Sequence, residues 1–292
     1  AKPSSSAASK RPRSSIASKP VLLATSGDPA GLGPRAVVLA LRRRSVRAVC
    51  EPVVVGERAV WVRAGWTPAL AGLVDTGLGA RPPRYGKPSA ETGALSFAAL
   101  RLALRLISRG VGQALVTAPI SKKAWDLAGV AYRDHTEWLS RETQSPGAQM
   151  VLGAPSKNLW TVLVTRHLPL AEVPSLLTAR SVLSAACSLD RALRALGVAR
   201  PRLGLCGLNP HAGEDGLLGP EERRLLAPAV RRARALGLSL AGPIAADTAW
   251  RWHVAGRLDG LVTLYHDQSL IALKAAAGLS IVNWTTGLPF AR

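Results

Sequence analysis

Three of the five histidines in this 292-residue chain lie within three residues after short apolar runs of the kind that form buried strands. These are His167 after residues 159–164, His211 after residues 203–208, and His266 after residues 261–265. The carboxyl ends of parallel strands share one edge of a sheet, where ligands bind in open α/β folds. Three imidazoles with an open fourth position are typical of a catalytic divalent-metal site. The alternative is three unrelated loop histidines, and the pattern alone favours it, because no two of them have the short spacing of a metal motif.

Other groups near these positions have candidate roles of their own. Asp267 and Asp247 could orient the imidazole rings, and Asp247 could instead simply cap a helix. His253 lies mid-helix among apolar residues, so we expect a packed or surface histidine and no ligand. Cys206 has leucine and glycine neighbours and is predicted to be a buried structural thiol.

The elements that must position these groups alternate as strand, loop and helix from residue 21 onward. Strands are expected at 21–25, 51–56 and 114–117, and helices at 35–44 and 90–110. Alternation of this kind predicts an α/β fold with parallel strands and crossover helices.

Composition excludes several classes of protein. Hydrophobic residues make up 48% of the chain, yet no uninterrupted apolar segment approaches the roughly 18 residues needed to span a bilayer. The three cysteines form no CxxC pair, which fits neither a zinc finger nor a disulfide framework. We therefore expect a soluble, cytoplasmic protein with reduced thiols and no membrane association.

The net charge of +20 is unevenly distributed. Five positive charges and no acid fall within residues 1–20, which we expect to be a disordered basic tail. Many other arginines cluster in predicted helices, such as residues 42–47 and 231–234. This pattern favours solvated helix faces over nucleic-acid binding, and a nucleic-acid binder would show a steep salt dependence.

Eight motifs, in order and in spacing, resemble the 4-hydroxythreonine-4-phosphate dehydrogenase family of vitamin B6 biosynthesis. They are SGDPAGLGP at 26–34, TAPISKKA at 117–124, DHTEWL at 134–139, TRHLPL at 165–170, CGLNPHAGEDG at 206–216, ADT at 246–248, YHDQSLIALK at 265–274 and VNWTTGLPFAR at 282–292. The resemblance extends over residues 21–292.

This resemblance implies a two-domain α/β/α sandwich like that of isocitrate and isopropylmalate dehydrogenases, in a homodimer with active sites at the subunit interface. Residues 21–133 and 268–292 would form the first domain, and residues 134–267 the second domain with the dimer interface. The family pattern continues past Arg292 with a further motif and a final helix, so we expect the C-terminal end of the first domain to be missing.

The resemblance also assigns the site residues. Metal ligands from both chains would be His167, His211 and His266; substrate-binding residues would be His135, Thr136, Lys274, Asn283 and Arg292; the candidate catalytic acids are Asp247 and Asp267. The family reaction uses NAD or NADP and a divalent metal such as Zn, Mg, Mn or Co. It oxidises the C3 hydroxyl of 4-phosphooxy-L-threonine, and the 3-oxo acid decarboxylates to 3-amino-2-oxopropyl phosphate. No residue is assigned to the nucleotide or as the general base.

Several residues depart from the family pattern. Asp134 replaces a glycine before His-Thr, Ser269 and Ala272 replace a glycine and a proline, and Trp284 places a bulky ring beside Asn283. Two alternatives therefore stand beside the leading hypothesis: a paralogue acting on threonate or erythronate 4-phosphate, and a truncated, catalytically silent relative.

Overall fold

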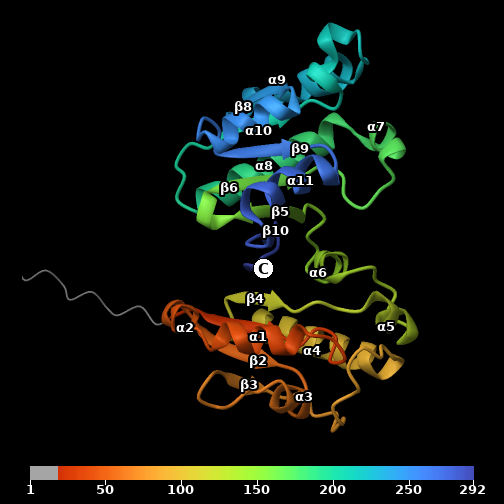
Figure 1. The fold of residues 1–292 in the computed structure, drawn as a ribbon, viewed down its shortest axis with the longest axis vertical. Helices are drawn as coiled ribbons and strands as arrows, with labels where there is room; N and C mark the ends of the chain where they lie inside the picture. Colours follow the sequence, from red (N-terminus) through yellow and green to blue (C-terminus); the bar gives the residue numbers. More distant parts are fainter. Residues whose placement is uncertain (1–18) are drawn as a thin grey trace, which may run out of the picture. The chain divides into compact units, whose positions relative to one another are not determined.

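The computed structural model describes residues 19–292 and divides the chain into two units, residues 1–130 and residues 131–292 (Figure 1). The predicted basic tail at 1–20 lies outside the described residues except for its last two. Of these, Lys19 donates a hydrogen bond from Nζ to the Arg47 carbonyl oxygen at 2.8 Å.

The first unit is built on a parallel sheet with the strand order β3-β2-β1-β4. Its strands are β1 (Val21–Thr25), β2 (Glu51–Val55), β3 (Gly72–Val74) and β4 (Ala114–Thr117). Its helices are α1 (Gly33–Leu41), α2 (Arg44–Val49), α3 (Arg58–Arg63), α4 (Ala90–Ser108) and α5 (Lys122–Leu127). The parallel pairing expected for this region is confirmed.

Helix α4 shows how local sequence sets the packing of this unit. Ser89 and Thr92 form a reciprocal capping box that starts the helix. Gly93 then allows close approach to α5, because a Cβ atom there would lie 1.9 Å from the Ala124 carbonyl oxygen. A glycine is required at this crossing for steric reasons.

The second unit is built on a mixed sheet with the strand order β10-β5-β6-β9-β7-β8. Its strands are β5 (Gln149–Ala154), β6 (Leu159–Leu163), β7 (Arg202–Cys206), β8 (Ser239–Ile244), β9 (Gly260–Thr263) and β10 (Val282–Thr286). Its helices and helical turns are α6 (His135–Glu142), η1 (Pro155–Lys157), η2 (Leu170–Glu172), α7 (Val173–Leu176), α8 (Ala179–Ala195), η3 (Pro210–Gly216), η4 (Glu222–Leu226), α9 (Ala227–Ala235), α10 (Ala246–Val254) and α11 (His266–Ala277).

Strands β6, β9, β7 and β8 are parallel, whereas β5 and β10 run antiparallel to their neighbours. The antiparallel part differs from the all-parallel expectation. Only the short turn η1 and Asn158 join β5 to β6, and a connection this short forms a hairpin because it leaves no room for a crossover helix.

Helices cover both faces of this sheet, which makes the second unit an α/β/α sandwich (Figure 1). Adjacent strand residues alternate between two cores, as Val162 and Leu163 do in β6. One core holds the buried faces of α8 and α9, and the other holds those of α10 and α11. Because an apolar core packs against each face of the sheet, the positions of its strand ends are fixed.

Residues 268–292 belong to the second unit, and their expected place in the first domain is therefore corrected. Strand β10 pairs antiparallel with β5 over five residue pairs, including Asn283 with Leu152. Trp284 packs against one core of the second unit and Ile281 against the other. The backbone ladder and this apolar packing hold the C-terminal segment to the second sheet. The boundary after residue 130 also lies a few residues before the expected one after residue 133.

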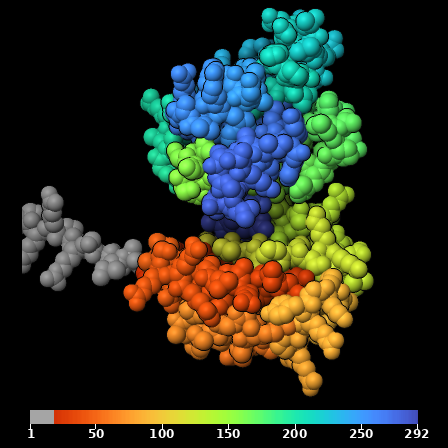
Figure 2. Space-filling model, in the orientation of Figure 1, coloured from red at the N-terminus to blue at the C-terminus, as the bar shows by residue number. Residues whose placement is uncertain are grey.

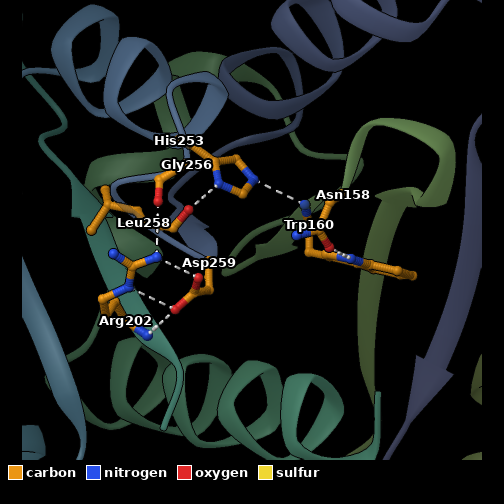
Figure 3. A network of polar contacts seen from close by, with 7 residues as sticks. All are labelled: Asn158, Trp160, Arg202, His253, Gly256, Leu258 and Asp259. Atoms are coloured by element: carbon orange, nitrogen blue, oxygen red, sulfur yellow. Dashed lines mark hydrogen bonds and ion pairs between the residues drawn. The ribbon is translucent and has the colours of Figure 1, made fainter. Parts of the chain in front are cut away.

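A buried histidine ties several of these elements together (Figure 3). His253 is 2% exposed, and its Nε2 accepts a hydrogen bond from the Trp160 backbone N–H at 2.9 Å. Its Nδ1 lies 2.9 Å from the Leu258 carbonyl oxygen. Of the two expected positions for this residue, packed or at the surface, the packed one is confirmed. Close by, Arg202 forms an ion pair with Asp259 at 2.8 Å.

Across residues 19–292, none of the helices combines the length and the apolar character that crossing a membrane requires.

Candidate functional site

The three predicted metal ligands each follow the carboxyl end of one of three neighbouring parallel strands. His167 follows β6, His266 follows β9, and His211 follows β7, and these strands lie side by side in the order β6-β9-β7. The carboxyl ends of parallel neighbours lie at one edge of the sheet. The strand-end placement inferred from the sequence is therefore present in the structure.

His167 and His266 come together at this edge. Their ring centroids are 5.5 Å apart. The His266 Nδ1 lies 2.7 Å from Asp267 Oδ1, and both of these side chains reach solvent. When the carboxylate accepts the Nδ1–H, the Nε2 of His266 keeps a lone pair for a ligand. Two imidazoles and an orienting carboxylate match the chemistry of a divalent-metal site.

His211 does not complete a three-ligand group with this pair in a single chain. Within residues 19–292, no three His, Cys, Asp or Glu side chains are close enough together to hold a metal ion. His211 is exposed on η3. The segment around η3 and η4, coloured cyan, stands out from the body of the second unit (Figure 2).

The turn that carries His211 has an unusual backbone. Five consecutive residues, from His211 to Asp215, have positive φ angles between 41° and 80°. Only Gly213 among them adopts that region without steric cost, which for other residues is about 1–2 kcal/mol each. Such a conformation persists only where the surrounding contacts determine it.

A second group of predicted residues lies together around Arg292. The Arg292 Nη1 donates a hydrogen bond to Thr136 Oγ1 at 3.1 Å and another to Thr285 Oγ1. The backbone N–H of Thr285 donates to the Arg292 carbonyl oxygen at 2.6 Å. His135, at the start of α6, is 8% exposed and interacts electrostatically with Arg292.

Burial sets the charge of this second group. Loss of solvent, together with the positive charge of Arg292, lowers the pKa of His135 to about 3. Burial also lowers the pKa of Arg292 to about 10, and the carboxylate of Asp134 partly opposes that shift. At neutral pH the group therefore presents one guanidinium cation, one neutral imidazole and the Thr136 hydroxyl. This combination suits an anionic, hydroxylated ligand.

The residues that depart from the family pattern have structural roles. Asp134 is the N-cap of α6 and accepts a hydrogen bond from the Glu137 N–H at 2.9 Å. Ser269 is fully buried and donates to Thr161 Oγ1 at 3.3 Å. Trp284 meets the Trp160 ring edge-on, with centroids 6.3 Å apart. Ala272 packs, partly buried, against the core of α10 and α11.

The remaining predicted residues are all exposed. Asp247 lies in the first turn of α10, which packs beside η3. Lys274 lies on α11, on the helix that begins with His266, and Asn283 lies on the edge strand β10. They lie on the same unit as the two groups above.

Three further residues support the site, and the sequence did not single them out. Thr285 orients Arg292, and Glu222 and Gln268 hold the backbone before His211. A glutamate at a helix start resembles a solvated acid in the sequence, so Glu222 carried no signal. Gln268 and Thr285 lie within the recognised motifs, which is the only indication that could have pointed to them.

The family model described as "Pyridoxal phosphate biosynthetic protein PdxA" matches residues 48–292. The chain belongs to this family. A 4-hydroxythreonine-4-phosphate dehydrogenase from Geobacter metallireducens is 36% identical over 294 residues, covering 94% of this chain and 86% of the relative. A D-threonate 4-phosphate dehydrogenase from Salmonella typhimurium is also 36% identical, covering 92% of this chain and 88% of the relative.

Solved structures give the same result for the fold of this PdxA family member. The crystal structure of a 4-hydroxythreonine-4-phosphate dehydrogenase from Klebsiella pneumoniae superimposes with a TM-score of 0.85 at 35% identity, covering 95% of this chain and 89% of that one. The family and the α/β fold class predicted from the sequence are confirmed. The chain is therefore a member of a dehydrogenase family.

Proposed function

We propose that this protein oxidises 4-phosphooxy-L-threonine with NAD or NADP in vitamin B6 biosynthesis. The reaction depends on a divalent metal and takes place in the cytoplasm, in a homodimer that shares its active sites. The observation that carries this proposal is the group formed by Arg292, Thr136 and His135, because it offers a cation and a neutral imidazole to a phosphorylated acid. Family membership supports the same reaction.

In this proposal Arg292 binds an anionic oxygen of the substrate through charge-assisted hydrogen bonds. Thr136 and Thr285 hold the guanidinium in place, so that little ordering is left to occur upon binding. Neutral His135 exchanges hydrogen bonds with the substrate without adding a second positive charge. Exposed Lys274 supplies a further cation for the phosphate, and Asn283 supplies an amide.

The donor set beside β6 and β9 fits a divalent ion. His167 and His266 would hold it, with His211 from the second copy of the chain, and Zn, Co, Mn and Mg are the candidate ions. A bound ion supplies Lewis acidity at the substrate hydroxyl. Asp267 fixes the orientation of the His266 ring, and Asp247 supplies a second exposed acid near the His211 turn.

The reaction balances as an oxidation followed by a decarboxylation. The hydride on C3 passes to the nicotinamide ring, the hydroxyl proton leaves, and C3 becomes a ketone. The bond between C2 and the carboxylate then breaks to release carbon dioxide, and C2 takes up a proton. The products are 3-amino-2-oxopropyl phosphate and the reduced nucleotide.

A second candidate substrate is threonate or erythronate 4-phosphate. Two relatives named for D-threonate 4-phosphate match at 35% and 36% identity, which is the same level as relatives named for 4-hydroxythreonine-4-phosphate. The candidates differ at C2, where an amine is replaced by a hydroxyl. Substrate preference therefore depends on what faces C2.

The test is NAD and NADP reduction by purified dimer with each phosphorylated acid and with Zn²⁺, Mg²⁺, Mn²⁺ or Co²⁺. We expect the highest kcat/KM with 4-phosphooxy-L-threonine and no turnover after chelation. A higher value with threonate 4-phosphate would favour the second candidate. A metal-loaded dimer that is inactive on all of these substrates would refute the enzymatic proposal and leave a catalytically silent relative.

A further inference from the structure

We propose that Glu222 and Gln268 are positioning residues: they hold the loop at residues 207–209, which leads into the His211 turn, and so fix the turn relative to His266. The inference rests on the proposed function, because His211 acts there as a metal ligand. It assigns a role to two side chains that touch neither the metal site nor the substrate group directly.

Glu222 holds the turn through its backbone N–H groups. It is 3% exposed and begins the π-helical turn η4. Its Oε1 accepts from the Leu208 N–H at 2.8 Å and from the Asn209 N–H at 2.9 Å, and its Oε2 accepts from Asn209 Nδ2 at 3.1 Å. A buried carboxylate with three N–H donors makes strong, directional contacts.

Gln268 holds Gly207, the residue immediately before Leu208. It is 8% exposed in the first turn of α11, two residues after His266. Its Nε2 donates to the Gly207 carbonyl oxygen at 2.7 Å, and its Oε1 accepts from the Leu264 N–H at 2.7 Å. One side chain thus joins the end of β9, the helix that begins at His266 and the loop that leads to His211.

The left-handed turn fits closely around Glu222. A Cβ atom at Gly213 would lie 2.6 Å from Glu222 Oε2, so the glycine at the middle of the turn packs directly on the carboxylate. His211, Ala212, Glu214 and Asp215 hold positive φ angles that side chains disfavour. The contacts made by Glu222 and Gln268 determine this conformation, and without them we expect the turn to sample other conformations.

The experiment uses the full-length dimer in Glu222→Leu, Glu222→Gln and Gln268→Glu variants. Glu222→Leu removes every acceptor for the turn. Glu222→Gln keeps one oxygen for the Leu208 and Asn209 N–H groups, and so serves as the conservative rescue. Gln268→Glu keeps the acceptor for Leu264 but places an oxygen against the Gly207 carbonyl oxygen. Val182→Ala, in the fully buried face of α8, serves as a control that lowers stability away from the turn.

Two readouts are compared: amide hydrogen exchange of residues 207–216 in the metal-free protein, and the dissociation constant for Zn²⁺ by calorimetry. For Glu222→Leu and Gln268→Glu we expect exchange to accelerate and the dissociation constant to rise by roughly tenfold or more. Glu222→Gln should stay within about threefold of the wild type, since it retains both backbone hydrogen bonds. Val182→Ala should lower the melting temperature while leaving both readouts unchanged.

Folded Glu222→Leu and Gln268→Glu variants with wild-type exchange in the turn would overturn the inference. So would faster exchange with an unchanged dissociation constant for Zn²⁺, because the residues would then be merely structural. If Glu222→Leu fails to fold, Gln268→Glu and Glu222→Gln decide the outcome. A His211→Ala dimer is measured in parallel: if it keeps full Zn²⁺ affinity, the proposed function fails, while the exchange readout still tests the contacts made by Glu222 and Gln268.

Discussion

Replacing His253 with leucine tests the buried network at the centre of the second unit. The substitution leaves two backbone groups without a partner in a site that is 2% exposed: the Trp160 N–H and the Leu258 carbonyl. The parallel pairing of β6 with β9 begins at Thr161. The Trp160 N–H, one residue earlier, therefore donates to the imidazole and not to β9. Each unsatisfied buried group costs about 1–3 kcal/mol, so we expect a loss of about 2–6 kcal/mol.

The same site predicts a pH dependence. Burial lowers the pKa of His253 below its ordinary value of 6.5. The folded state needs the neutral ring, because Nε2 must accept a hydrogen bond from Trp160. Below pH 6.5 the unfolded chain takes up a proton that the folded chain does not. The stabilisation is therefore complete above pH 6.5 and is lost as the pH falls towards the folded pKa, with a slope of up to about 1.4 kcal/mol per pH unit.

Urea unfolding of the second unit, followed by circular dichroism at pH 7.5 and pH 5.5, checks both predictions. Arg202→Met is the control, because it breaks an ion pair with Asp259 whose arginine is half exposed and should therefore lower stability much less than His253→Leu does. His253→Leu should also reduce the loss of stability between the two pH values. A His253→Leu protein as stable as the wild type, or with the same pH dependence, would refute the reasoning.

Three other predictions follow from the structure. Gly93→Ala places a Cβ atom 1.9 Å from a backbone oxygen, and it should lower the stability of the first unit by about 1–3 kcal/mol, measured by thermal unfolding. Gly147→Ala is the control and should be nearly neutral, because the space around Gly147 is open. Arg292→Met should raise KM for the phosphorylated substrate by roughly tenfold or more, while the dissociation constant for Zn²⁺ stays constant. Arg257→Met, at an exposed arginine, is the control. Equal KM values for Arg292→Met and the wild type would contradict the anion site. His211→Ala should lose bound metal, measured by elemental analysis, while its circular dichroism spectrum is retained, and full metal content would count against the three-histidine site.

Much of this protein follows from local sequence patterns. Apolar runs that stop at turn residues predict the strands that carry His167, His211 and His266, because a buried strand must end where polar residues begin. The alternation with helices predicts the parallel core of each sheet, and the ordered motifs predict the family. These inferences need only neighbouring residues and their spacing.

Other features depended on contacts between distant segments, and only the tertiary structure decided them. The pairing of β10 with β5 moves residues 268–292 into the second unit, and no local pattern specifies which sheet an edge strand joins. The carboxylate of Asp134 caps α6 and also acts electrostatically on Arg292, and the second of these contacts depends on the tertiary fold. His167 and His266 lie together at the sheet edge, while Glu222 and Gln268 hydrogen-bond to the loop that leads into the left-handed His211 turn. These contacts join segments that are distant in the sequence, so no local pattern specifies them.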